Sequence, residues 1–161
     1  MTTITLGLAR IGDVPAIAQL SRIVIEQGLP WHWTPRRIAA HMRQRDSLLV
    51  VARDNRELVG FVMAQFGDAA VHITLLGVIT SRQRRGAGRR LMLWVEESAV
   101  AAGLFKISLE VRAGNRAALR FYAALGYTQS GVLDGYYSGV EDAVTLVRDL
   151  RISAVRPKGT Q

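Results

Sequence analysis

A basic segment with two glycines, SRQRRGAGRR (81–90), stands between two apolar stretches of the sequence. The stretch before it predicts a strand, and the stretch after it, GRRLMLWVEESAVAAG, predicts a long helix. The first amides of a helix lack partners inside the helix, and the helix dipole favours negative charge at that end. Because glycines let a phosphate approach the backbone closely, the segment predicts an anion-binding loop at the start of a helix.

Other interpretations of this segment fit less well or stay open. A Walker A loop requires Lys followed by Ser or Thr where this sequence has Arg89 and Arg90. A dinucleotide-binding fingerprint requires a third small residue where the sequence has Leu91. A nucleic-acid surface would interleave aromatic side chains with the arginines, and residues 81–90 contain none. A solvated turn that happens to be basic is the structural alternative.

Glu110 is a candidate general base. It stands in the predicted strand FKISLEV (105–111), between Leu109 and Val111, where a carboxylate is costly to bury unless it faces a polar cleft. In a partly desolvated cleft such a carboxylate can accept a proton, directly or through water. The alternative is a structural ion pair with Arg112, which lies two residues along on the same face of the strand, or with a neighbouring arginine.

Tyr122 is a candidate general acid on the next predicted helix. Asn115 predicts the cap of that helix. Tyr122 follows it by seven residues, so the two side chains can share one face of the helix. A tyrosine in this position is otherwise a core residue whose hydroxyl lies at the edge of the core. Both interpretations stay open on the residues alone.

Several of these motifs resemble one known family. The strand, loop and helix LLGVI, QRRGAG and RRLMLWVEESA resemble the acetyl-CoA-binding segment of the GCN5-related N-acetyltransferase (GNAT) superfamily. SLEVRAGNRAALRFYAALGY (108–127) and GYYSGVEDAVTL (135–146) are most similar to its branch of ribosomal-protein N-terminal alanine acetyltransferases. The resemblance covers residues 47–150 by motif, and residues 1–46 only by the order of the predicted elements.

The resemblance implies an enzyme that transfers the acetyl group of acetyl-CoA, without a metal ion, to a primary amine. In this branch the amine is a protein or peptide N-terminal α-amine. The resemblance further implies Glu110 as the general base and Tyr122 as the general acid that protonates the leaving thiolate. It also implies that amides of the loop bind the cofactor pyrophosphate and that the end of the preceding strand pairs with the pantetheine arm. The implied cofactor-binding residues are Val78, Gln83, Arg84, Arg85, Gly86, Ala87, Gly88, Arg89 and Asn115.

The same resemblance places the acceptor between two segments, GLPWHWTP (28–35) and LDGYYSGVED (133–142). The implied substrate-binding residues are Trp31, Trp33, Tyr136 and Tyr137. Packing of the tryptophans under their loop is the alternative. Because the stretch between Tyr137 and Glu141 is shorter than in the alanine acetyltransferases, the acceptor stays open between a peptide, a polyamine and a small antibiotic-like amine. A catalytically silent acyl-CoA-binding module and a nucleic-acid-binding domain are alternatives from other classes.

The 161 residues, with a net charge of +8, fit one domain that attracts anionic ligands. We expect residues 1–152 to form this domain and residues 153–161 to be a flexible tail. The absence of cysteine excludes disulfides, thiolate metal ligands and a cysteine nucleophile. The histidines, His32, His41 and His72, lack metal-binding spacing and are interpreted as structural or surface residues. With neither a signal peptide nor an apolar stretch of membrane-spanning length, we expect a cytoplasmic monomer or homodimer without membrane or nucleic-acid partners.

Periodicity and turn residues predict elements in the order β–α–α–β–β–β–α–β–α–β–β. The predicted strands are 3–8, 47–53, 58–66, 70–79, 105–111, 127–133 and 141–150, and the predicted helices are 13–27, 34–44, 88–103 and 115–126. Asp13 and Thr34 predict the caps of the first two helices, each followed by a proline in the first turn. This order and the resemblance predict a mixed α/β GNAT fold, with a mostly antiparallel seven-stranded sheet and about four helices on both its faces.

Overall fold

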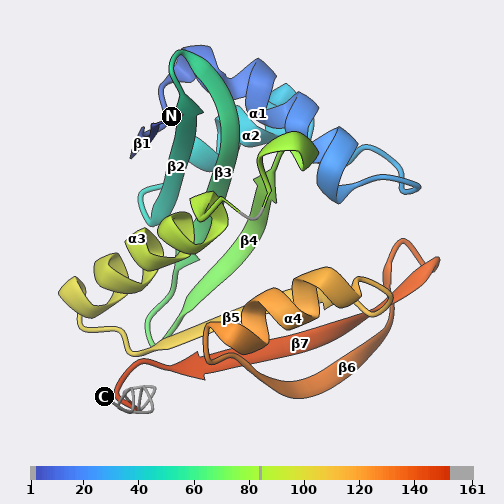
Figure 1. Cartoon of the computed structure of the whole chain (residues 1–161). Helices are drawn as coiled ribbons and strands as arrows, with labels where there is room; N and C mark the ends of the chain where they lie inside the picture. Colours follow the sequence, from blue (N-terminus) through green and yellow to red (C-terminus); the bar gives the residue numbers. More distant parts are fainter. Residues whose placement is uncertain (1–2, 84, 153–161) are drawn as a thin grey trace, which may run out of the picture.

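Seven strands form one sheet in the order β1-β2-β3-β4-β5-β7-β6 (Figure 1). In the computed structural model, which describes residues 3–83 and 85–152, β4 and β5 are parallel and all other neighbouring strands are antiparallel. The predicted mixed, mostly antiparallel sheet is thus confirmed, while the predicted tail 153–161 lies outside the described residues. The strands are β1 (Ile4–Leu8), β2 (Ser47–Asp54), β3 (Glu57–Phe66), β4 (Val71–Val78), β5 (Lys106–Arg112), β6 (Thr128–Tyr137) and β7 (Glu141–Asp149).

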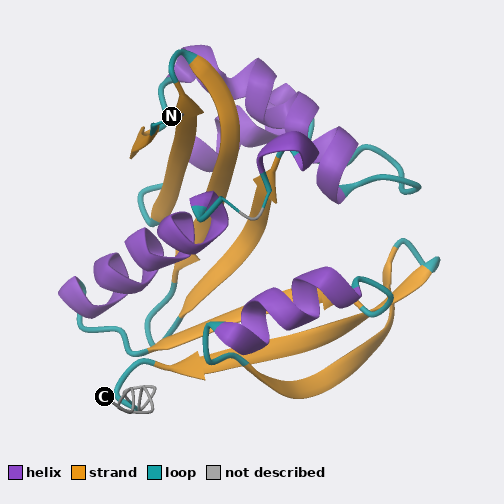
Figure 2. Cartoon of the chain, in the orientation of Figure 1, coloured by secondary structure: helices purple, strands orange, loops and turns teal. Residues whose placement is uncertain are grey.

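Helices cover both faces of the sheet, as predicted (Figure 2). On one face lie α1 (Val14–Leu20), its continuation as a π-helical turn η2 (Ser21–Ile25), and α2 (Pro35–Met42). On the other lie α3 (Ala87–Ala101) and α4 (Arg116–Ala124). Short 3-10 turns, η1 (Ile11–Asp13) and η3 (Thr80–Arg82), precede α1 and α3. The first helix was expected to continue to Gln27, but its α-helical part ends at Leu20.

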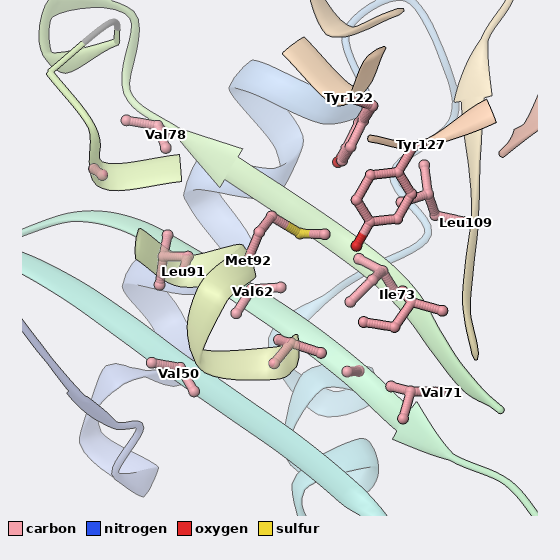
Figure 3. Close-up of a cluster of buried hydrophobic side chains, with 14 of the residues drawn as sticks. Val50, Val62, Val71, Ile73, Val78, Leu91, Met92, Leu109, Tyr122 and Tyr127 are labelled. Carbon is pink, nitrogen blue, oxygen red and sulfur yellow. The ribbon is translucent and has the colours of Figure 1, made fainter. Parts of the chain in front are cut away.

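Alternation along the central strands divides the buried side chains into two cores. Val50 and Val62 face α3, whose Leu91, Val95 and Ala99 are fully buried, as the helical periodicity predicts (Figure 3). The neighbouring positions on the same strands face the other way and pack with side chains of α1 and α2, and this second core includes Ile17, Ile38, Val51, Phe61 and Met63. Each of these fully buried aliphatic or aromatic side chains contributes about 1.5–3 kcal/mol of hydrophobic stabilisation.

A bulge in β4 changes which face its side chains occupy. Met63 of β3 pairs with Leu75 and Ala64 pairs with Ile73, so Thr74 is an extra residue on β4. Ile73 consequently packs in the α3 core, and Leu75 packs in the α1–α2 core. The ladder between β4 and β5 covers only residues 71–73 and 107–109, and beyond it the two strands diverge (Figure 1). The edge of β4 at residues 74–78 therefore has no partner strand from β5.

Most of the predicted helix boundaries follow from local capping. The Oγ1 atom of Thr34 accepts a hydrogen bond from the amide of Arg37 (3.4 Å), and Oδ1 of Asn115 accepts one from the amide of Ala118 (3.1 Å). Both predicted caps are confirmed. Gly103 and Gly126, which follow α3 and α4, have φ values of +76° and +93°, as expected for glycines that end helices.

The predicted cap at Asp13 is wrong. Asp13 has helical dihedral angles, and its side chain makes no capping bond to α1. Its carboxylate instead accepts a hydrogen bond from the amide of Arg10 (2.9 Å) and pairs with Arg53 of β2. The carboxylate therefore stabilises the preceding 3-10 turn and its contact with the sheet, because an ion-pair partner 40 residues away competes with the local cap.

Candidate active site

The predicted anion loop opens α3 with a glycine in a left-handed conformation. Gly86 is the N-cap with a φ of +85°, and as a glycine it has no side chain with which to cap the helix. A Cβ atom at Gly86 would meet nothing within 4 Å, so this position requires glycine for its backbone angle rather than for space. The amides of the first turn, beginning at Ala87, have no acceptor inside the helix, which suits an external acceptor. Arg90 is the first residue whose amide bonds back to Gly86 (3.0 Å).

Gly88 serves a packing role that the sequence did not indicate. A Cβ atom there would lie 3.2 Å from Cζ of Phe121 on α4, so glycine lets α4 approach the first turn of α3. Gln83 fixes the loop from the other side, because its side-chain amide donates to the carbonyl of Val78 (2.9 Å) at the end of β4. The structure therefore brings Val78, Gln83, Gly86 and Gly88 together at one end of the sheet.

The arginines of this segment contribute both to contacts within the fold and to exposed positive charge. Arg82 binds Asp54 (3.0 Å) and Glu57 (3.6 Å) of the β2–β3 turn, and Arg90 donates to the carbonyl of Ile4. Arg85 and Arg89 have exposed side chains beside the first turn of α3, while Arg84 lies outside the described residues. The positive field at the loop therefore comes partly from side chains that also hold the sheet together.

Glu110 lies next to a histidine. The Nε2 atom of His72 is 2.6 Å from Oε2 of Glu110, and their side chains are 37% and 20% exposed. His72 pairs with Ser108 in the short β4–β5 ladder, so His72, Ser108 and Glu110 share one face of the sheet. The alternative ion pair between Glu110 and Arg112 is wrong, because Arg112 binds Glu141 instead (3.1 Å). The interpretation of His72 as a structural or surface residue missed this contact, since it depends on the register of two distant strands.

Two tyrosines at the end of β6, Tyr136 and Tyr137, lie near Glu110. The rings of Tyr136 and Tyr137 are 4.9 Å apart at the end of β6. Burial raises the pKa of Tyr136, and the carboxylate of Glu110 raises it further. Burial also raises the pKa of Tyr137, with smaller contributions from Tyr136 and Glu110. Tyr137 in turn raises the pKa of Tyr122. Tyr137 therefore lies in electrostatic reach of both predicted catalytic residues.

Tyr122 is a core residue on α4, 7% exposed, in edge contact with Phe121 and with Tyr127 (ring centroids 5.0 and 5.6 Å apart). Figure 3 shows Tyr122 and Tyr127 side by side among the buried side chains of the α3 core. Burial, which is the main cause, raises the pKa of Tyr122 well above its ordinary value. The hydroxyl therefore stays protonated at neutral pH, as a proton donor must be before it acts.

The loop between α1 and α2 is held by a buried carboxylate that no sequence motif indicated. The carboxylate of Glu26, a residue 7% exposed, accepts hydrogen bonds from the amides of His32 (2.7 Å) and Trp33 (3.0 Å) and from the hydroxyl of Ser21 (2.9 Å). This role depends on the path of the loop, because the partners lie five to seven residues from Glu26 along the chain.

Trp31 and Trp33 are both half-buried against the α1–α2 core, so the predicted alternative of packing under the loop holds for part of each ring. Arg22 lies 4.8 Å from the centre of the Trp31 ring, and Trp33 contacts His41 and His32 edge-on. Among the described residues, no group of three or more His, Cys, Asp and Glu side chains could hold a metal ion. Within the same part of the chain, no helix is long and apolar enough to cross a membrane.

Comparison with known proteins agrees with this arrangement. The sequence profile of the Acetyltransferase (GNAT) family matches residues 17–127. The chain belongs to the GNAT family of acetyltransferases. The predicted resemblance, the fold and the assignment as an acyltransferase are thus confirmed. The match spans the loop at the start of α3 as well as Glu110 and Tyr122, whereas Tyr136 and Tyr137 lie beyond it.

Relatives of this GNAT chain include enzymes that modify protein N-termini. A [Ribosomal protein bS18]-alanine N-acetyltransferase from Salmonella typhimurium is 26% identical over 145 residues, which cover 88% of this chain and 95% of the relative. The structure resembles that of the ribosomal-protein-S18-alanine N-acetyltransferase from Escherichia coli, with a TM-score of 0.80, 24% identity and coverage of 92% and 94%. It also resembles Arabidopsis thaliana NAA60 in complex with acetyl-CoA, with a TM-score of 0.82, 21% identity and coverage of 92% and 99%.

Proposed function

We propose that this GNAT chain transfers the acetyl group of acetyl-CoA to the N-terminal α-amine of a protein or peptide. The observation that carries the proposal is the His72–Glu110 pair, which lies where β4 and β5 begin to diverge. A carboxylate on this face can receive the proton of an incoming amine. The name of the Salmonella relative, whose acceptor is an alanine of a ribosomal protein, supports an α-amine as that acceptor. Because ribosomal proteins are made in the cytoplasm, we also propose that location.

The start of α3 suits the diphosphate of acetyl-CoA. Its N-cap, Gly86, has no side chain to occupy the first-turn amides, and Arg85 and Arg89 add exposed positive charge beside them. The unpartnered edge of β4 at residues 74–78 suits the amides of the pantetheine arm, which would bond to it as an added strand does. Asn115 is a further proposed contact beyond its capping role. When bound there, acetyl-CoA supplies the activated carbonyl carbon of its thioester.

Glu110 and Tyr122 divide the proton transfers of the reaction. Glu110 accepts a proton from the α-ammonium group, directly or through water, so that the amine nitrogen gains a free electron pair. That nitrogen then forms a bond to the acetyl carbon as the carbon–sulfur bond breaks, and the positively charged nitrogen releases its surplus proton to water. Tyr122 donates its hydroxyl proton to the departing sulfur. His72, at 2.6 Å, holds the carboxylate of Glu110 in one orientation and gives it a hydrogen-bonding partner.

The acceptor chain would enter between the α1–α2 loop and the β6–β7 hairpin. Tyr136, 49% exposed, and Tyr137 present phenol groups from the hairpin beside Glu110. The exposed edges of Trp31 and Trp33 face outward from the opposite loop in this proposal. An extended peptide terminus fits such aromatic walls because rings provide contact area at a low cost in side-chain entropy.

A comparison of acceptor classes tests the proposed function. The release of CoA thiol would be followed for three substrates: a peptide with a free α-amine, the same peptide blocked at its N-terminus but carrying lysine, and a polyamine. We expect turnover with the first peptide to exceed that with the other two by at least about tenfold, as expected when one acceptor is bound for reaction. Preference for the polyamine would support a small-molecule acetyltransferase instead. Turnover of no amine, with intact acetyl-CoA binding, would support a silent binding module.

A further inference from the structure

Arg112 contacts both of the segments that flank the proposed acceptor site. Its guanidinium group binds Glu141 at the start of β7, with Nε and Nη2 each 3.1 Å from Oε1. Nη1 donates to the carbonyl of Gln27 (2.6 Å) and, at 3.5 Å, to that of Ile25. One side chain, 23% exposed, therefore joins the end of η2 to the β6–β7 hairpin.

The contacts of Arg112 connect it to the α1–α2 loop on one side and to the β6–β7 hairpin on the other. On one side, the carbonyl of Gln27 belongs to the α1–α2 loop, residues 26–34, whose far end is held by the Glu26 carboxylate. On the other side, Glu141 also accepts a hydrogen bond from the amide of Gly114 (3.3 Å) and pairs with Tyr137 across the hairpin. The positive charge of Arg112 further acts on Tyr137, where it opposes the rise in that residue's pKa.

The position of Arg112 on β5 explains how one residue can serve both segments. Ser108, Glu110 and Arg112 alternate with buried residues and share one face of the strand. Arg112 is the last residue of β5, in the region where β4 has diverged from it, so its long side chain is not covered by a neighbouring β4 residue. Arginine suits this position because its planar group donates several hydrogen bonds in fixed directions.

We propose that Arg112 is a positioning residue that sets the distance between the α1–α2 loop and the β6–β7 hairpin and so controls the binding of the acceptor peptide. The proposal rests on the proposed function, because it assigns those segments to the acceptor. Arg112 touches neither the loop of α3 nor the His72–Glu110 pair in any hydrogen bond that the described residues make. It therefore affects the binding of the acceptor peptide, and neither the rate of the chemical step nor the binding of acetyl-CoA.

The test compares Arg112→Gln, Arg112→Lys and Glu141→Gln with Arg56→Gln, a change of an exposed arginine in the β2–β3 turn. For Arg112→Gln we expect the KM for the acceptor peptide to rise about tenfold, the effect of losing a charge-assisted contact, while kcat and the KM for acetyl-CoA stay within about twofold. Arg112→Lys should give an intermediate KM, because an ammonium group has no planar fork with which to bind both segments at once. Arg56→Gln should match the wild type.

Amide hydrogen exchange provides the second measurement, since it needs no turnover. In Arg112→Gln the amides of His32, Trp33 and Val140 should all exchange faster, whereas in Glu141→Gln only the hairpin amide should do so. Unchanged exchange in both segments, or a lower kcat with an unchanged acceptor KM, would overturn the proposal. If the wild type acetylates no peptide, the proposed function fails and the acceptor role of Arg112 fails with it, while the exchange rates still show whether Arg112 joins the two segments.

Discussion

The imidazole of His72 and the carboxylate of Glu110 lie 2.6 Å apart on neighbouring parallel strands that remain paired for only three residues. The contact places a polar pair on the sheet face that also carries α1 and α2, at the last point where β4 and β5 are joined. It gives the predicted base a defined orientation, and it brings into the site a histidine that showed no signal in the sequence.

Glu110→Gln should lower kcat by at least about a hundredfold, since a positioned base typically contributes that much or more. The dissociation constant of acetyl-CoA, measured by calorimetry, should not change, because the proposed phosphate contacts lie at the start of α3 and Glu110 is proposed to act on the acceptor amine. A Glu110→Gln enzyme with wild-type kcat would exclude this residue as the base.

His72 should act through Glu110, and two variants separate orientation from proton transfer. His72→Leu removes the hydrogen bond and should lower kcat about tenfold, whereas His72→Gln retains a donor and should recover most of that loss. The double variant His72→Leu, Glu110→Gln should be no slower than Glu110→Gln alone. Additive losses would show that His72 has a role independent of Glu110.

Tyr122→Phe should reduce kcat by about a hundredfold or more while leaving thermal stability nearly unchanged, because the buried ring remains. Tyr127→Phe is the matched control. Its hydroxyl is buried without a hydrogen-bonding partner among the described residues, so its removal should leave kcat unchanged and raise the free energy of unfolding by about 1 kcal/mol. Equal effects of both changes on kcat would contradict the assignment of Tyr122 as the acid.

Gly86→Ala should weaken acetyl-CoA binding, because alanine is strained at a φ of +85° and the loop would have to change shape. Gly103→Ala, at a φ of +76° after the other end of α3, introduces a similar strain away from the proposed cofactor site. Each of the two substitutions should lower the free energy of unfolding, measured in urea, by about 1 kcal/mol. Only Gly86→Ala should raise the dissociation constant of acetyl-CoA, and a rise in both would show that α3 as a whole, rather than its first turn, determines binding.

The stability of the fold should fall in mild acid because of His41. Burial lowers the pKa of His41 below its ordinary value of 6.5, and neither ring nitrogen has a hydrogen-bonding partner among the described residues. Below pH 6.5 the unfolded chain therefore binds a proton that the folded chain resists, so the free energy of unfolding decreases as the pH falls towards the folded-state pKa. His41→Leu should remove this slope in urea unfolding at pH 7.5 and pH 5.5. An unchanged slope would show that other titratable groups cause the pH dependence of the free energy of unfolding.

Much of the fold follows from local patterns. The strands and helices appear in the predicted order because alternation, helical periodicity, the caps at Thr34 and Asn115, and the terminal glycines each act within a few residues. The extra residue Thr74 in β4 could not be predicted in this way. A bulge depends on the pairing of β4 with β3, and the sequence of β4 alone also fits regular alternation.

The site was predicted less completely than the fold, for a related reason. The start of α3 and the pair Glu110 and Tyr122 carry short motifs that could be recognised. His72 and Glu26 carry none, and Arg112 lies within the motif 108–127 without any sign of its contacts, since all three bind partners brought close by the sheet register or by the path of a loop. The same applies to Glu96 of α3, whose buried carboxylate binds Arg148 of β7.

The measurement that tests the central claim most directly is the position of the acetyl group on a peptide product. A peptide with a free N-terminus and an internal lysine would be incubated with acetyl-CoA and the wild-type chain, with Glu110→Gln in parallel, and the products fragmented in a mass spectrometer. We expect acetylation of the α-amine by the wild type, and a product yield with Glu110→Gln that is lower by at least about a hundredfold. Acetylation of the lysine side chain alone, or equal α-amine acetylation by both proteins, would contradict the account.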